Sequence, residues 1–188
     1  MSCAVFPTDT LEPLSLVCHP AQPDGAVGGI AVMLTRGPEG VALRYRLDGD
    51  VAALRVPDAA TPLPPERLWA HTCFELFIAE AGAAGYREFN FSPNGQWMRF
   101  DFADYRQRIA SPAGAAPCIE TRRTGEGLEL QVHLDVEQLP PGDLVIGITA
   151  VVEHADGHHT YWALRHPAAQ PDFHHRDGFA LALKAVNP

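Results

Sequence analysis

The chain has 188 residues and a formal net charge of -9, with 23 acidic residues against 14 basic ones. A chain of this length buries roughly 70% of its unfolded surface in one core, so we expect a single domain over residues 1–188 that needs neither disulfides nor metal to fold. The acidic balance removes the attraction to phosphate on which nucleic-acid binders depend, and it excludes nucleic acid and anionic membranes as expected partners.

The first twenty residues carry no sign of export. They lack a basic start, include Asp9 and Glu12, and contain no apolar stretch long enough for a signal peptide or a membrane span. We therefore expect a cytoplasmic protein. The four cysteines are widely spaced: Cys3, Cys18, Cys73 and Cys118. Because no two of them form a Cys-x-x-Cys pair, free thiols are expected rather than a disulfide set or a zinc site.

Apolar and polar residues alternate along most of the chain, which indicates strands with one buried face. In chain order, strands are expected at residues 14–18, 27–35, 41–47, 71–79, 85–91, 97–102, 128–136, 144–153, 159–164 and 178–186. Residues 71–79 alternate less cleanly, which predicts a central strand covered on both faces. About ten strands separated by turn signals predict an antiparallel sandwich or barrel, and only residues 104–110 suggest a turn or two of helix.

The stretch "EFNFSPNGQWMRFDF" predicts a hairpin. Ser92-Pro93-Asn94-Gly95 suits a type I turn followed by a left-handed glycine, which joins strands 86–91 and 97–102. We expect Phe89 and Phe91 on one face. The apolar face of the return strand holds Met98, Phe100 and Phe102. The opposite face would gather Tyr86, Glu88, Asn90, Trp97, Arg99 and Asp101, a mixture unlike an ordinary solvated surface.

Two further tryptophans, Trp69 and Trp162, lie in polar surroundings. An indole ring beside polar groups suits a pyranose, because sugar C–H groups pack on the ring while the hydroxyls bind carboxylates, amides or guanidinium groups. Glu75 and Arg99 are candidates for those polar partners. The alternative, that the tryptophans plug the ends of the sandwich, stays open.

Histidines raise the question of a metal site. The weak candidates are His154, His159 and His174, since imidazole suits zinc, iron or nickel. Their spacing matches no metal motif, so structural or solvent-exposed roles are expected instead. Asp172 follows Pro171 and is expected to accept hydrogen bonds from backbone N–H groups two residues on, which would stiffen the loop.

Support for an enzyme is weaker. The chain has no Gly-x-Ser-x-Gly motif and no glycine-rich phosphate loop. Glu75 and Glu88 lie on strands that are candidates for neighbours, and a glycosidase needs two such carboxylates. We expect salt bridges to Arg99 or Arg87 as their use, and keep a hydrolase that uses Glu75 or Asp172 as an alternative.

The segments "LWAHTCFELFIAEAG", "YREFNFSPNGQWMRFDFADYR" and "YWALRHPAAQPDFHHRDGFALAL" resemble the DOMON-like proteins, a bacterial group related to family 9 carbohydrate-binding modules and to haem-binding DOMON domains. The resemblance covers about residues 27–184 and implies an immunoglobulin-like β-sandwich of jelly-roll type. It also implies two tryptophans that enclose a terminal sugar. The ligand-binding residues expected on this basis and from the hairpin are Trp69, Glu75, Asn90, Trp97, Arg99, Trp162 and Asp172.

The expected function is therefore non-catalytic binding of a carbohydrate or another polyhydroxylated metabolite, with no cofactor. Haem is the alternative cofactor, because the superfamily binds it through Met and His ligands. Met33 and Met98 fall in apolar phases that predict core positions, so no such ligand pair is assigned. A metal-binding protein and an uncharacterised hydrolase are competing hypotheses that the sequence leaves open.

Overall fold

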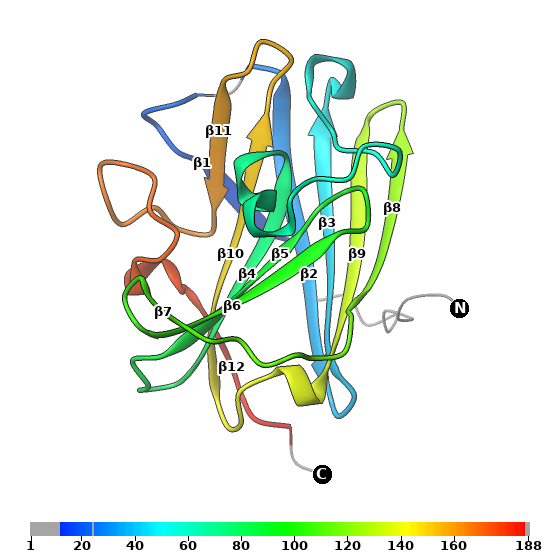
Figure 1. The fold of residues 1–188 in the computed structure, drawn as a ribbon. Coiled ribbons are helices and arrows are strands. Elements are labelled where there is room, and N and C mark those ends of the chain that lie inside the picture. Colours follow the sequence, from blue (N-terminus) through cyan, green and yellow to red (C-terminus); the bar gives the residue numbers. More distant parts are fainter. Residues whose placement is uncertain (1–11, 24, 187–188) are drawn as a thin grey trace.

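Two antiparallel β-sheets pack face to face in the computed structural model of the protein, which describes residues 12–23 and 25–186 (Figure 1). The sheet nearer the viewer in Figure 1, called the front sheet, has the strand order β7 (Gln107–Ile109), β6 (Trp97–Asp104), β5 (Tyr86–Phe91), β4 (Cys73–Glu80), β10 (Leu144–Glu153) and β11 (His159–Ala163). The other sheet, called the back sheet, has the order β2 (Val27–Gly37), β3 (Gly40–Gly49), β9 (Gly127–Asp135) and β8 (Cys118–Thr124).

Two short strands complete the sheets. β1 (Leu14–Cys18) joins them, because it pairs with β2 through residues 14–16 and with β11 through residues 17–18. β12 (Leu181–Leu183) pairs with the first residues of β10. The helical segments of the described ranges are short 3-10 turns: η1 (Val51–Ala53), η2 (Pro65–Ala70), η3 (Val136–Gln138) and η4 (Arg176–Gly178). The prediction of an all-β antiparallel sandwich with little helix is confirmed.

Strands β7 and β8 were not expected from the sequence. Residues 104–110 form the end of β6, a tight turn and β7 rather than helix, because Arg106 adopts a positive φ of 54° that reverses the chain at once. β8 lies at the edge of the back sheet, and nearly all of its residues are exposed. A strand with no buried face has no apolar alternation, so the sequence gives little sign of it.

The main core lies between the sheets and follows the predicted alternation. Along β3, Val41, Leu43, Tyr45 and Leu47 all point into it, and alternate residues of β9 face them from the neighbouring strand. From the front sheet the core receives Phe74, Leu76, Ile78, Phe89, Phe91 and alternate residues of β10.

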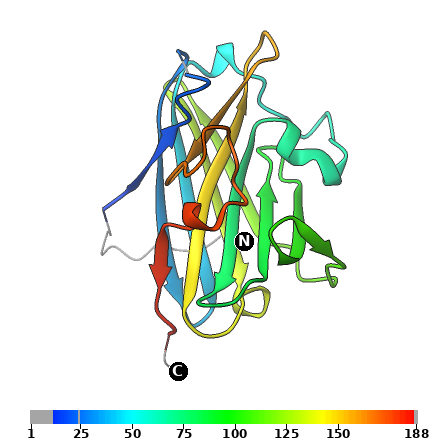
Figure 2. The same ribbon diagram turned by 90° about the vertical axis from the view of Figure 1, so that its left-hand side faces the viewer.

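The outer face of the front sheet carries a second apolar cluster. It consists of Phe77, Ala79, Tyr86, Phe100, Phe102 and Phe179. The segment between β11 and β12, coloured orange to red in Figure 2, lies alongside β10 and β4 and brings Phe173 and Phe179 onto Phe77. The front sheet is therefore covered on both faces in places, as the pattern of residues 71–79 predicted for the strand that forms β4.

The expected hairpin forms, but its faces are assigned differently from the prediction. Gly95 has φ +86° and its N–H donates to the Ser92 carbonyl over 3.0 Å, which closes the turn. Residues directly opposite each other on antiparallel strands share a face. The register pairs Glu88 with Phe100 and Phe91 with Trp97. The two strands thus combine Tyr86, Glu88, Asn90, Met98, Phe100 and Phe102 on the outer face, and Trp97, Arg99 and Asp101 on the other.

The cysteines follow the prediction only in part. Cys18 and Cys73 are free thiols. Cys118 is disulfide-bonded, which corrects the expectation of free thiols throughout, and Cys3 lies outside the described residues. In the described ranges, no helix has both the length and the apolar character that a membrane span requires.

Candidate functional site

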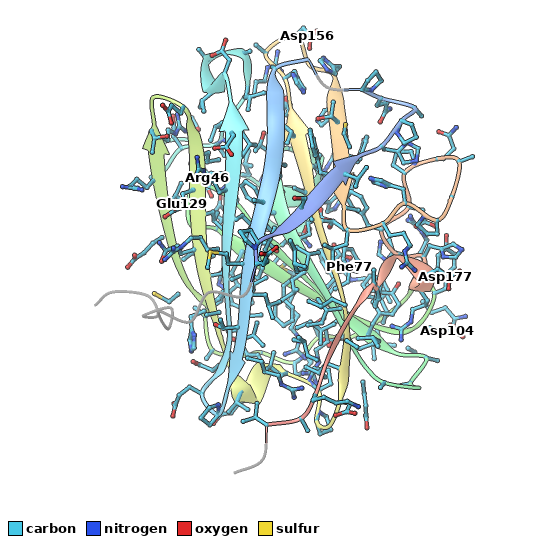
Figure 3. All side chains as sticks on the ribbon, turned by 180° about the vertical axis from the view of Figure 1, so that it is seen from behind. Arg46, Phe77, Asp104, Glu129, Asp156 and Asp177 are labelled. Carbon is cyan, nitrogen blue, oxygen red and sulfur yellow. The ribbon has the colours of Figure 1, made fainter. Side chains whose placement is uncertain are left out.

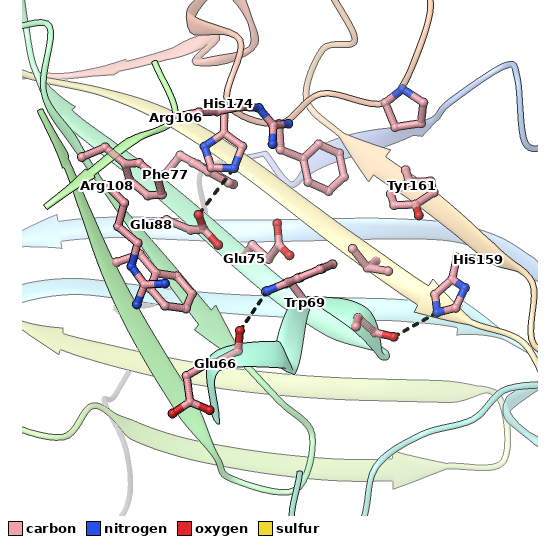
Figure 4. A pocket seen from close by; sticks show the side chains of 16 residues that line it. Glu66, Trp69, Glu75, Phe77, Glu88, Arg106, Arg108, His159, Tyr161 and His174 are labelled. Carbon is pink, nitrogen blue, oxygen red and sulfur yellow. Dashed lines mark hydrogen bonds and ion pairs between the residues drawn. The ribbon is translucent and has the colours of Figure 1, made fainter. Parts of the chain in front are cut away.

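A cleft of about 630 Å³ opens on the outer face of the front sheet (Figure 4). Its floor is built from side chains of the central strands, among them Glu75, Phe77, Glu88, Phe102 and Val151. Three segments form its walls: η2 with Trp69, the β6–β7 hairpin with Arg106 and Arg108, and the loop after β11 with Pro171, Phe173 and His174. The volume is in the range of small-molecule sites.

Two carboxylates occupy the floor. Glu75 is only 2% exposed and Glu88 only 5%. Oε2 of Glu75 accepts a hydrogen bond from the Thr149 hydroxyl at 2.9 Å, and Oε1 of Glu88 accepts one from the Asn90 amide at 2.6 Å. Neutral groups therefore supply the hydrogen bonds that these two acids receive within the described chain.

Burial controls the protonation of both acids. It raises the pKa of Glu75 well above the ordinary value of 4.5, and the neighbouring Glu88 carboxylate raises it further. Burial also raises the pKa of Glu88, to about 6, against the opposing effect of the Asn90 amide. The positive charges of Arg106 and Arg108 favour the ionised form of Glu88 as well. Both floor acids therefore keep their protons to a higher pH than an exposed glutamate does.

His174 lies above Glu88 between aromatic rings. Its Nδ1 is 2.8 Å from the Tyr86 hydroxyl, and its ring makes edge contacts with Phe77 and Phe102 at 5.3 and 5.1 Å. Burial first, and the charge of Arg106 second, lower the pKa of His174 to about 4. Nε2 of His174 is 3.7 Å from Glu88 Oε2 (Figure 4). Because the ring is neutral near pH 7, this approach is not an ion pair.

Asp172 ties two walls of the cleft together. Its carboxylate binds Arg106 Nη2 at 2.9 Å and accepts a hydrogen bond from the Tyr105 hydroxyl at 2.7 Å. The backbone N–H of His174 donates to Asp172 Oδ1 at 3.1 Å, which confirms the expected contact two residues on. Asp172 itself does not line the cleft. It acts by holding the β6–β7 hairpin against the loop that carries His174.

Trp69 is the large aromatic side chain at the rim. It is 48% exposed and lines the cleft from η2. Its indole N–H donates to the Glu66 carbonyl at 3.0 Å, which orients the ring although about half of the side chain stays exposed. Glu75 lines the same cleft, so the structure brings these two expected residues to one site (Figure 4).

The structure does not bring Trp162 to this site. Trp162 is 6% exposed and packs in the main core, where its indole N–H donates to the Thr160 hydroxyl at 3.1 Å. Its neighbour Tyr161 points to the other side of β11 and lines the cleft in its place. The expected enclosure of a ligand between Trp69 and Trp162 is therefore wrong, because alternation along β11 directs Trp162 inward.

Three more of the expected binding residues lie away from the cleft surface. Trp97 is partly buried against the main core. Arg99 is buried and binds Asp101 through Nε and Nη2 at 2.9 to 3.3 Å, so it pairs with neither Glu75 nor Glu88. Arg87 also binds Asp101, which leaves the expected salt bridges to the two glutamates unformed. Asn90 is fully buried and reaches the site only through its hydrogen bond to Glu88.

The histidines are not gathered into a metal centre. His154 is buried and stacks on His158 with ring centroids 3.8 Å apart. His159 and His174 both line the cleft, and Nε2 of His159 lies 3.1 Å from the Ala70 carbonyl oxygen. Among residues 12–23 and 25–186, no group of three or more His, Cys, Asp or Glu side chains has metal-binding geometry.

Several cleft residues were not singled out from the sequence. They are Glu66, Phe77, Arg106, Arg108, Tyr161 and Phe173. Phe100 and Phe102 were assigned to an apolar face away from Glu88, although they share its face. Counting residues opposite each other across the turn would have found these two. Loop residues such as Arg106 and Phe173 give no such signal.

Comparisons with known proteins point to the fold. No protein-family model and no curated protein matches the chain. A candidate carbohydrate-binding protein from Bacteroides uniformis superposes with a TM-score of 0.63 at 16% identity, over 88% of this chain and 82% of that one. A family 9 carbohydrate-binding module from Caldicellulosiruptor kristjanssonii, in complex with cellotriose, gives 0.58 at 10% identity, over 81% and 72%.

A family 9 module from the same organism in complex with glucose gives a TM-score of 0.50 at 10% identity, over 74% of this chain and 68% of that one. Identities this low establish a shared fold. The likeness to family 9 modules is therefore supported at the level of architecture, and the relation to DOMON domains stays a prediction.

The two tryptophans should differ sharply in their effect on folding. Trp162→Ala removes a core side chain and should lower the free energy of unfolding by about 3–5 kcal/mol. Trp69→Ala removes a half-exposed ring and should change it by less than about 1 kcal/mol. Urea denaturation followed by circular dichroism measures both. Equal losses would contradict the assignment of Trp69 to an open cleft wall.

Glu75→Gln should make stability less sensitive to pH. Because the folded-state pKa of Glu75 is raised, its contribution to stability is fully present below about pH 4.5 and is lost as the pH rises toward the folded value. Glutamine keeps the shape and the acceptor for Thr149 but does not titrate. The Tm of the variant relative to the parent should therefore increase between pH 5 and 8, by up to about 3–5 °C per pH unit.

Glu129→Gln is the matched control for this measurement, because Glu129 lies on β9 of the back sheet (Figure 3). Over the same pH range the Tm difference of Glu75→Gln from the parent should change more than that of this control. A change no larger than that of the control would contradict the raised pKa of Glu75.

Proposed function

We propose that the cleft binds a small carbohydrate or a similar polyhydroxylated metabolite without chemical change. The observation that carries this proposal is the exposed indole of Trp69 beside two buried carboxylates, on a floor otherwise lined by aromatic rings. A sugar needs both kinds of surface, because its C–H groups pack on aromatic faces and its hydroxyl groups require hydrogen-bond partners.

The groups needed by a sugar lie on facing sides of the cleft. Trp69 offers its half-exposed ring from η2, while Tyr161 and Phe173, with ring centroids 6.0 Å apart, form the wall beyond β10. Glu75 and Glu88 lie between these walls. A protonated Glu75 offers a sugar hydroxyl both a donor and an acceptor, whereas an ionised one offers acceptors alone. This arrangement favours a single sugar unit stacked on Trp69 with its hydroxyls directed to the floor.

Solved structures of other proteins with the same fold also support the proposal. The two family 9 modules were solved with cellotriose and with glucose, and the Bacteroides uniformis protein is a candidate carbohydrate-binding protein. We expect modest affinity here, because sugar hydroxyls exchange water for protein partners at little net gain.

Replacement of Trp69 tests the proposal. In isothermal titration calorimetry, glucose, cellobiose and cellotriose should be screened against the parent protein, and Trp69→Ala should weaken the binding of any ligand found by at least about tenfold, because it removes the stacking surface. Trp69→Phe should retain part of the affinity. Val136→Ala, which shortens an exposed side chain on η3, is the control and should bind like the parent. Full affinity in Trp69→Ala would refute this site.

A glycosidase is the second candidate, and the relation of the two floor carboxylates favours it. The β4–β5 register pairs Glu75 with Asn90 and Phe77 with Glu88, so the two glutamates are diagonal neighbours on one face. Buried, interacting carboxylates with raised pKa values are the groups used in glycoside hydrolysis.

Product analysis separates the two candidates. On the binding proposal, cellobiose and p-nitrophenyl glucosides should be recovered intact after long incubation with the protein. Release of product that Glu88→Gln abolishes, with binding retained, would establish a hydrolase instead.

A further inference from the structure

The two floor carboxylates lack a cationic partner. Among the described residues, no lysine or arginine forms an ion pair with Glu75 or Glu88, and the approach of His174 involves a neutral ring. Oε1 of Glu75 has no hydrogen-bond partner in the same part of the chain, and its carboxylate is directed into the cleft (Figure 4). A buried carboxylate without a neighbouring cation is costly to ionise. A ligand that brings a positive charge would therefore stabilise the ionised form of each acid.

The two arginines of the cleft each have a closer partner than the floor acids. Arg106 pairs with Asp172 at 2.9 Å. Arg108 lies with its guanidinium 4.0 Å from the centre of the Phe100 ring, which also lines the cleft. Both act on Glu88 only through space. The lining holds three carboxyl groups, counting Glu66 at the rim, and two guanidinium groups, one of which is paired with Asp172.

The aromatic rings next to these acids add a second preference. Trp69 and Tyr161 line the same cleft as Glu75, and Phe77 lies on the strand of Glu75 two residues further. The faces of aromatic rings carry negative electrostatic potential and attract ammonium groups. Buried carboxylates combined with aromatic walls thus favour a cation more than a neutral molecule.

We propose that the ligand of this cleft is a polyhydroxylated amine, such as an amino sugar, whose ammonium group binds between Glu75 and Glu88 while its ring stacks on Trp69. The inference rests on the proposed function and narrows it. The ammonium would supply the charge that the floor lacks, and it would donate hydrogen bonds to Glu75 Oε1 and to the Glu88 carboxylate. An N-acetyl group at the same position removes that charge and adds bulk.

A matched set of sugars tests the inference by calorimetry at pH 7: glucosamine, glucose, N-acetylglucosamine and glucuronate. Glucosamine should bind at least about tenfold more tightly than glucose, because a charge-assisted hydrogen bond is stronger than a neutral one. Glu75→Gln and Glu88→Gln should each reduce that preference, and the double variant should remove it. Glu129→Gln, which removes an equal charge from the back sheet, should keep it.

Proton release gives a readout that does not depend on affinity. Binding of glucosamine should release protons from the cleft acids, measured in two buffers of different ionisation enthalpy, because a bound cation favours their ionised forms. Binding of glucose should release fewer protons from the protein. Equal binding of glucose and glucosamine, or tighter binding of glucuronate, would overturn the inference and leave sugar binding intact. Failure of all four sugars to bind would overturn the proposed function as well.

Discussion

The strict alternation of side chains along a strand is the constraint on which this structure depends, because the front sheet is packed on both faces. On β4, Phe74 enters the core between the sheets, while Glu75 and Phe77 belong to the cleft. On β11 the same rule sends Trp162 inward and Tyr161 outward. Since the period is two, a shift of one residue in a central strand of the front sheet would exchange its core-facing and outward-facing residues.

Much of the fold could be predicted from the sequence, because half-buried strands show a regular alternation of apolar and polar residues. β3 and β9 are recognisable in this way, and so is the turn at residues 92–95. β7 and β8 escape prediction for the opposite reason, since exposed strands have no apolar phase. The half-buried strands of the sandwich can be predicted from the local alternation of apolar and polar residues. The exposed edge strands are defined only by their hydrogen bonds to neighbouring strands.

The candidate site was predictable only in part. Trp69 and Glu75 stand out because an aromatic ring and an acid in apolar surroundings are unusual on their own. The sequence pattern assigns Glu88 to a salt bridge, because it places the hairpin faces in the wrong phase. Arg106 and His174 reach the cleft through loops whose closure depends on contacts far apart in the chain. Such contacts leave no periodic signal, so sequence pattern cannot place them.

The hydrogen bonds around Tyr86 connect the turn at Arg106 to the histidine above Glu88. The Tyr86 oxygen accepts from the backbone N–H of Arg106 at 3.1 Å, and Nδ1 of His174 lies 2.8 Å from the same hydroxyl. When this hydroxyl donates to Nδ1, the neutral imidazole carries its hydrogen on Nε2, the nitrogen that lies 3.7 Å from Glu88. In that tautomer the ring presents a donor, not an acceptor, to the occupant of the space above Glu88.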